Sequence, residues 1–571
     1  MKKFILFLIF LLILFNVKNS YAIYDPLTTP NNRFGIHVID ENDLQDAAKL
    51  VNSSGGDWGY VAIVIREDDR NIQKWQTIFE KFRELHLIPL VRLATRVENA
   101  AWIKPRKEDI GSWADFLNSL NWVIENRYII LFNETNHAKE WGNELAPSEY
   151  VAFVKEFSEK LKAKSADFFI IQAGLDASAP NSQDTMDETV YLEKMFDTDK
   201  NWLNYIDGWS SHSYPNPGFV GNPSSIGRGT VKTYLWEKQI LQNYGLTKQL
   251  PVFITETGWK HSMGRQIDRN LPSPQIAANN YITAFTSVWT DNQIVAVSPF
   301  LLNYQDYPFD HFSFKMLDTN QFYPAYEAIN QISKNAGKPK QLINANFVNP
   351  FLPEKLVKHS QYAFEIDIEN KGQAVIDGDD GWKVEITGLP KNFKIDISKI
   401  EKTSPFQRTR VKINIESPDS SGKYNYQILL LKDDKIIDKL ENNLYIIPPP
   451  ELMLNSYEWF NKLAQGNDFK LLIYDENQKL VVEKNFVTFT KGLAEITGLY
   501  NVVPGKKYRV VLIKTNYLPR QSIVVISETK TAVTFNKLLP FDPSNDGKFT
   551  IGDLILLIKR PISSFRLLLG F

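Results

Sequence analysis

Between about residues 32 and 335 the chain alternates short apolar runs with longer segments whose apolar residues recur at helical spacing. The runs predict eight strands, over 34–39, 60–65, 88–93, 128–132, 168–172, 208–211, 252–255 and 295–302. The segments between them, such as 71–85 and 148–162, predict amphipathic helices. Eight β/α units predict an α/β fold of the (β/α)8 (TIM) barrel type over 32–337. An open doubly wound sheet is the alternative, but no glycine-rich phosphate loop follows the first run.

After Gly337 the period of the pattern changes to two. Apolar and polar residues alternate over 364–368, 383–386 and 411–415, which predicts half-buried antiparallel strands. We therefore expect two β-sandwich-like domains and a short final segment. The first is an Ig-like sandwich over 341–447, the second a β-rich domain over 451–539 that follows a stiff triple-proline linker, and the last a loop and helix over 540–571.

The amino terminus has the pattern of an export signal. A basic start is followed by an apolar stretch over 4–15 and by Ser20-Tyr21-Ala22, small residues that a signal peptidase accepts. This pattern predicts a signal peptide over 1–22 and a secreted or cell-surface protein. A membrane anchor is the alternative, but the apolar stretch is shorter than the roughly 20 residues of a span.

Composition narrows the classes of chemistry. The chain has no cysteine, which excludes disulfides, zinc-thiolate sites and a cysteine nucleophile. A formal net charge of -1 gives no field to attract nucleic acid, so none is expected as a partner. The motifs of a serine nucleophile elbow and of a His-Glu-x-x-His metal site are also missing.

Two of the predicted strands end on a glutamate. The run 129–134 ends in Asn133-Glu134, and the run 252–256 ends in Glu256. In a β/α barrel the carboxyl ends of all strands meet at one face, which carries the chemistry. Two facing carboxylates are what hydrolysis of a glycosidic bond requires, one as proton donor and the other as nucleophile or base.

The segments Asn133-Glu134 and Thr255-Glu256-Thr257-Gly258-Trp259 resemble those of retaining β/α-barrel glycoside hydrolases, which place the acid/base on strand four and the nucleophile on strand seven. The resemblance covers about 32–335. It implies that Glu134 is the acid/base, that Glu256 is the nucleophile, that Asn133 holds the sugar's 2-hydroxyl group, and that catalysis needs no cofactor.

His212-Ser213-Tyr214 is similar to the His-x-Tyr of these enzymes, in which the tyrosine contacts the nucleophile. Arg66 matches their arginine beside the nucleophile, where a cation would keep Glu256 ionised. Arg92 is an alternative for this role. Trp259 is expected either to stack on a sugar ring or to pack in the core. The chain departs from the group in the missing histidine near strand three and the missing tryptophan at the end of strand eight.

A candidate calcium loop lies near the end of the sequence. A calcium loop of this type has oxygen ligands at positions one, three, five and twelve and a glycine at position six. Here the ligand positions hold Asp542, Ser544, Asp546 and Asp553, and the glycine is Gly547. With the apolar segment after it, this loop resembles one half of a dockerin, although dockerins carry two such repeats. The resemblance implies a structural Ca²⁺ and a scaffold or cell-surface partner. A simple Asp-Gly turn before a helix is the alternative.

Together these patterns predict a secreted retaining glycoside hydrolase that cleaves a β-linked poly- or oligosaccharide. A non-catalytic carbohydrate-binding surface protein on a degenerate barrel is the second hypothesis. An inverting hydrolase or a transglycosylase on the same scaffold is the third, and the distance between the two carboxyl groups separates inversion from retention.

Overall fold

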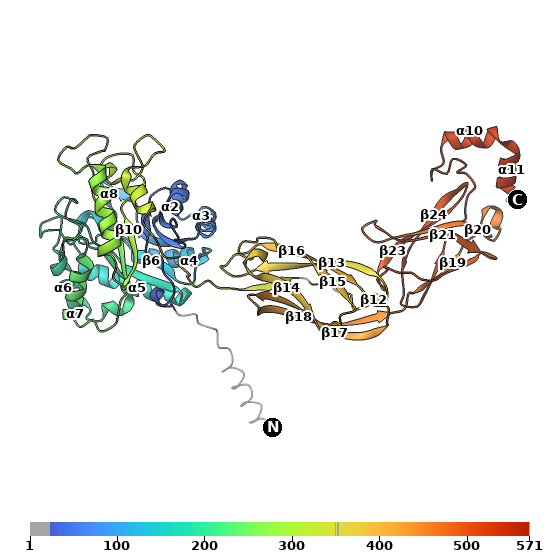
Figure 1. The fold of residues 1–571 in the computed structure, drawn as a ribbon, viewed down its shortest axis with the longest axis horizontal. Coiled ribbons are helices and arrows are strands. Elements are labelled where there is room, and N and C mark those ends of the chain that lie inside the picture. Colours follow the sequence, from blue (N-terminus) through green and yellow to red (C-terminus); the bar gives the residue numbers. More distant parts are fainter. Residues whose placement is uncertain (1–22, 349, 351–352, 570–571) are drawn as a thin grey trace, which may run out of the picture. The chain divides into compact units, whose positions relative to one another are not determined.

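A computed structural model describes residues 23–348, 350 and 353–569. The predicted signal peptide lies outside these residues. The chain divides into two compact units after Leu342 (Figure 1). Within the described ranges, none of the helices combines the length and the apolar character needed to cross a membrane.

The first unit contains each of the eight predicted strands, and all their pairings are parallel. The strands are β1 (Gly35–Val38), β2 (Gly59–Arg66), β3 (Leu87–Ala94), β6 (Arg127–Leu131), β7 (Phe168–Gln172), β8 (Trp209–His212), β9 (Val252–Thr257) and β10 (Ile294–Pro299). They form two sheets, ordered β1-β2-β3-β6-β7 and β10-β9-β8. Single bridges between Phe34 and Val297 and between Ile171 and Gly208 join the edges of the two sheets.

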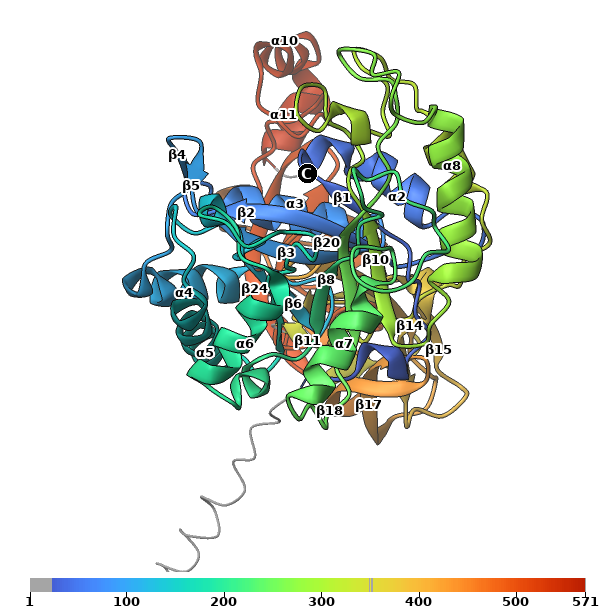
Figure 2. The same cartoon turned by 90° about the vertical axis from the view of Figure 1, so that its left-hand side faces the viewer.

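Helices surround these strands (Figure 2). They are α2 (Leu44–Val51), α3 (Ile72–Glu84), α4 (Ile110–Ser119), α5 (Pro147–Lys164), α6 (Glu188–Thr198), α7 (Thr233–Asn243), α8 (Pro274–Thr283) and α9 (Pro324–Asn330). Helix α3 shows how the local sequence determines where a helix begins and which of its faces is buried. The Asn71 side chain caps its first turn by accepting from the Lys74 N–H, and Trp75, Ile78, Phe79 and Phe82 are buried along one face.

Burial explains why the strand pattern was readable. Every residue of β1, β7, β8, β9 and β10 is buried, as expected for parallel strands covered by helices, and the strand side chains join one large apolar core. The short hairpin of β4 (Val97–Glu98) and β5 (Ala101–Trp102) was not predicted, because two residues per strand give no period to recognise.

The second unit is mostly antiparallel β structure. Its first eight strands form two four-stranded sheets, ordered β11-β13-β16-β15 and β12-β18-β17-β14, around one apolar core. The strands are β11 (Ala345–Val348), β12 (Lys355–Val357), β13 (Gln361–Asn370), β14 (Trp382–Thr387), β15 (Lys394–Ile397), β16 (Arg408–Glu416), β17 (Gly422–Lys432) and β18 (Lys435–Ile447). Buried and exposed residues alternate along β16, which matches the two-residue period of its sequence.

Seven further strands form sheets ordered β22-β19-β25 and β21-β20-β23-β24 around a separate core. They are β19 (Glu451–Asn455), β20 (Gly466–Tyr474), β21 (Leu480–Phe489), β22 (Leu493–Ile496), β23 (Lys507–Lys514), β24 (Tyr517–Val525) and β25 (Lys530–Thr534). Helices α10 (Ile551–Lys559) and α11 (Pro561–Leu569) follow. A capping box, in which Thr550 and Asp553 exchange hydrogen bonds, starts α10.

Candidate active site

The carboxyl ends of the parallel strands bring Glu134, His212 and Glu256 together. The His212 Nδ1 atom lies 2.9 Å from Glu134 Oε1 and 3.8 Å from Glu256 Oε2. One carboxylate oxygen of Glu134 and one of Glu256 lie within 4.8 Å of each other. These residues follow β6 and end β8 and β9, strands that lie in two different sheets. The site therefore exists only where the two sheets face each other.

Glu256 is a buried carboxylate with several polar neighbours. The Tyr214 hydroxyl donates to its Oε2 over 3.0 Å, and Arg92 donates to its Oε1 over 3.3 Å. Burial acts to raise the pKa of Glu256, but the charges of His212 and Arg92 and the hydrogen bond from Tyr214 outweigh it, so the pKa lies below its usual value. The lowered pKa favours the ionised form of Glu256 at neutral pH.

His37, at the end of β1, completes the surroundings of Glu256. Its Nε2 atom lies 3.9 Å from Glu256 Oε1, and burial lowers the pKa of the imidazole to about 4. His37 is therefore neutral near pH 7 and contributes a polar contact. The sequence named Arg92 as the alternative to Arg66, whereas it did not assign His37 to the site, although His37 lies near the end of a predicted strand.

Glu134 is held in a strained turn. Its φ is 28°, and that of Phe132 is 72°, a conformation uncommon for residues with a side chain. The turn lets the Glu134 N–H donate to the Gly174 carbonyl over 3.0 Å, while the Glu134 carbonyl accepts from the His137 N–H over 2.8 Å. The side chain of Glu134 is 20% exposed, so it is the carboxylate of the pair more open to solvent.

His212 lies against Gly174, on the loop after β7. A Cβ atom at position 174 would come within 2.2 Å of His212 Cδ2, so any other residue there would displace the ring. Burial acts to lower the pKa of His212, but the charge of Glu256 and the hydrogen bond with Glu134 raise it above its usual value. His212 is thus buried, positioned by a glycine and electrostatically tied to both carboxylates.

Two residues expected in the site lie elsewhere. Arg66 pairs with Asp68 over 3.0 Å and is half exposed, so the pairing with Glu256 is made by Arg92 instead. The reason is local, since Asp68 gives Arg66 a carboxylate two residues away. Trp259 is 1% exposed, and its indole N–H donates to the Gly221 carbonyl over 2.8 Å. Its ring belongs to the core and is not free to stack on a sugar.

Asn133 contacts a carboxylate that the sequence did not single out. Its amide donates to Glu140 Oε2 over 3.4 Å, and its own carbonyl oxygen is buried without a partner in the part of the chain described. Burial, and then the nearby charge of Glu134, raises the pKa of Glu140 to about 7. Only the fold reveals this residue, because Glu140 ends a three-residue 3-10 helix that has no recognisable sequence pattern.

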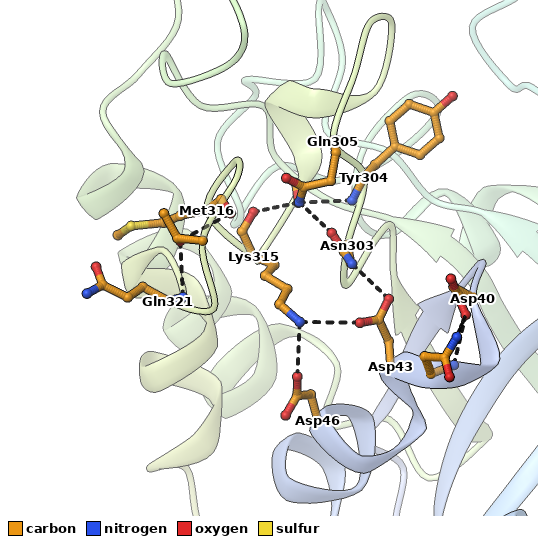
Figure 3. Close-up of polar contacts among 12 residues, drawn as sticks. Asp40, Asp43, Asp46, Asn303, Tyr304, Gln305, Lys315, Met316 and Gln321 are labelled. Carbon is orange, nitrogen blue, oxygen red and sulfur yellow. Dashed lines mark hydrogen bonds and ion pairs between the residues drawn. The ribbon is translucent and has the colours of Figure 1, made fainter.

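A network of polar side chains fastens the loop after β10 to the start of α2. Lys315 pairs with Asp43 and Asp46, each over 3.4 Å, and the Asn303 amide donates to Asp43 over 2.9 Å (Figure 3). Gln305 in turn donates to Asn303 over 2.5 Å. The loops after β1 and β10 are thus joined.

The structure also describes the candidate calcium loop. Carboxylate oxygens of Asp542, Asp546 and Asp553 lie within 4.8 Å of one another. Asp542 accepts from the N–H groups of Asp546 and Gly547 over 3.1 and 2.9 Å and from the Ser544 hydroxyl over 3.2 Å. Hydrogen bonds from Ser544 and Thr550 hold the pKa of Asp553 far below its usual range. The oxygen ligands of this loop are of the kind that a hard divalent cation prefers.

Neither a family model nor a curated protein matches the chain. Among solved structures, a family 39 glycoside hydrolase from Bacteroides cellulosilyticus WH2 gives a TM-score of 0.37 at 13% identity, over 69% of this chain and 82% of its own. A GH5 protein from Streptomyces cattleya, solved with Manβ1-4GlcNAc, gives a TM-score of 0.38 at 12% identity. The match covers 53% of this chain and 80% of that protein. An endo-β-1,4-glucanase from Xanthomonas axonopodis pv. citri gives a TM-score of 0.33 at 11% identity. The match covers 52% of this chain and 98% of that enzyme. Identities and TM-scores this low transfer no chemistry from those proteins to this chain.

The Gly174–His212 contact can be tested by a double-mutant cycle on stability. Gly174→Ala should destabilise the protein by about 1–3 kcal/mol, the usual range for overpacking, because the new methyl group meets the imidazole. In a His212→Ala background, Gly174→Ala should lower the free energy of unfolding by much less, because the obstructing ring is absent. Unfolding in urea measures both. Equal costs in the two backgrounds would show that the ring and the glycine are not coupled.

Proposed function

We propose that this protein is a secreted retaining glycoside hydrolase built on a closed (β/α)8 barrel. The observation that carries the proposal is the approach of the two carboxylates, with oxygens of Glu134 and Glu256 within 4.8 Å. Retaining enzymes hold their carboxyl groups about 5–5.5 Å apart, and inverting enzymes about 6.5–9.5 Å apart to admit a water molecule. The approach of the nearest oxygens supports the shorter, retaining arrangement, in which one carboxylate attacks the sugar directly.

In the first step Glu256 attacks the anomeric carbon while the bond to the leaving oxygen breaks. Its lowered pKa supports the nucleophile role, because the attacking group must be ionised. Glu134 gives its proton to the leaving oxygen. With a proton on Nδ1, His212 would donate to Glu134 Oε1, which lies 2.9 Å away, and Oε2 would carry the transferred proton. The products are a glycosyl-enzyme ester on Glu256 and a free alcohol.

In the second step Glu134, now ionised, takes a proton from water as that water attacks the anomeric carbon. The ester bond to Glu256 breaks, the carboxylate returns and the sugar keeps its configuration. Asn133, directly before Glu134, would hold the sugar's 2-hydroxyl group, a contact that strengthens in the transition state.

A carbohydrate-binding protein on a degenerate barrel is the alternative. Binding alone has no need of an ionised, buried carboxylate surrounded by Arg92, His212 and Tyr214, which is costly to desolvate. This arrangement favours the enzyme.

Both catalytic roles can be tested with aryl β-glycosides that carry a good leaving group. We expect Glu256→Ala to abolish turnover. Glu134→Ala should lower the turnover rate about 10²–10⁴-fold, which is the usual contribution of general acid–base catalysis. Azide should rescue Glu134→Ala and yield a β-glycosyl azide, because the small anion replaces the activated water. A wild-type protein that binds glycan but turns over no substrate in a broad panel would overturn the proposal, and an azide product of inverted configuration would overturn retention.

The role of Arg92 can be tested by the pH dependence of kcat/KM. Removing this cation should raise the pKa of Glu256 toward the value that burial favours. Glu256 acts when ionised. The acid limb of the pH profile, where kcat/KM falls as Glu256 is protonated, should therefore lie at a higher pH in Arg92→Ala than in wild type. Arg66→Ala is the matched control, since Arg66 pairs with Asp68, and its profile should coincide with that of wild type. A shift in Arg66→Ala with none in Arg92→Ala would contradict the pairing.

We also propose that Asp542, Ser544, Asp546 and Asp553 hold a structural Ca²⁺. The clustering of three carboxylates supports it, as does the turn at Gly547, whose φ is 79°. Adding Ca²⁺ to chelator-treated protein should raise the melting temperature of the second unit, and Asp546→Asn should reduce the increase. Calorimetry that detects no Ca²⁺ binding would contradict the site and leave the Asp-Gly turn as its explanation.

A further inference from the structure

Helix α10 exposes an apolar face. Ile551, Leu554, Ile555 and Ile558 follow the i, i+3, i+4, i+7 spacing of one helix side, and their exposed fractions range from 46% to 78%. In a globular domain such a face normally packs on the core. Of the residues described in α10, only Asp553 is buried.

Helix α11 also exposes apolar side chains to solvent. Ile562 is 74% exposed and Phe565 is 64% exposed. We call the exposed apolar residues of both helices the apolar stripe, which consists of Ile551, Leu554, Ile555, Ile558, Ile562 and Phe565. Single exposed apolar residues are ordinary, but a contiguous series on two consecutive helices indicates a binding surface.

The charge of the same segment has one sign. Lys559, Arg560 and Arg566 lie between or beside the residues of the apolar stripe, and the described segment after Asp553 contains no acidic residue. None of the three cations makes an ion pair with another described residue. Arg560 and Arg566 line an open hollow of about 390 Å³ at the start of α11, together with Pro561, Ile562 and Ser563.

We propose that α10 and α11 form an anchor that lies on an anionic phospholipid bilayer. The two guanidinium groups of the hollow match the phosphates of lipid headgroups, with which arginine forms charge-assisted hydrogen bonds. The apolar stripe would enter the boundary between headgroups and acyl chains. Each helix has nine residues, far fewer than the roughly 20 of a membrane span, so the helices lie on the bilayer without crossing it.

Charge favours a lipid surface over a second copy of the chain. Pairing two stripes would bring six unpaired cations together, which repel one another, whereas an anionic bilayer attracts them. The inference is independent of the glycosidase proposal, because none of its residues belongs to the first unit.

Co-sedimentation of the full chain with vesicles tests the anchor. We expect binding to vesicles of phosphatidylcholine with phosphatidylglycerol, little binding to phosphatidylcholine alone, and release by salt. Arg560→Gln/Arg566→Gln should weaken binding roughly 30-fold, from the usual contribution of basic residues near an anionic surface. The control Lys479→Gln/Lys537→Gln removes two exposed charges elsewhere in the same unit and should bind as wild type does.

A second pair of substitutions separates the apolar contribution. Ile558→Ser/Ile562→Ser should lose vesicle binding while the circular dichroism spectrum and melting temperature stay unchanged, since both side chains are exposed. Failure of the wild type to bind anionic vesicles would overturn the proposal. So would a dimer in light scattering that the Ile558→Ser/Ile562→Ser variant converts to a monomer, since the stripe would then be an interface between copies.

Discussion

The charge of Glu256 is the constraint around which the site is arranged. A carboxylate removed from water strongly favours its protonated form, and a protonated carboxyl group is a poor nucleophile. The structure offsets that tendency with a guanidinium, an imidazole and a phenol hydroxyl, supplied by Arg92, His212 and Tyr214. Arg92 comes from β3, whereas His212 and Tyr214 come from the end of β8 and the two residues after it, so the positions of β3, β8 and β9 are tied to one ionisation.

The backbone accommodates these contacts at small, specific points. Gly174 leaves room for the His212 ring, and the left-handed turns at Phe132 and Glu134 aim the second carboxylate toward the first. Strain of this kind persists only in rigid surroundings. The buried strands supply that rigidity, and the contacts of Lys315 with Asp43 and Asp46 join the loops after β1 and β10.

The sequence predicted what depends on local patterns. Eight apolar runs became eight parallel strands, and two glutamates at run ends became neighbours, because the carboxyl ends of β6 and β9 meet where the two sheets face each other. It could not predict which strand-end arginine turns toward Glu256, since that depends on nearby partners such as Asp68. Nor could it reveal the burial of Trp259 or the contact of Glu140 with Asn133, which arise only from tertiary packing.

The side chains around Glu256 come from strands at the beginning, middle and end of the first unit, from His37 to Glu256 itself. Contacts between residues so far apart in sequence require distant parts of the chain to come together first. A chain with only one complete sheet would hold only some of these groups. The appearance of a functional site would therefore report the meeting of the two sheets, and not the formation of either sheet alone.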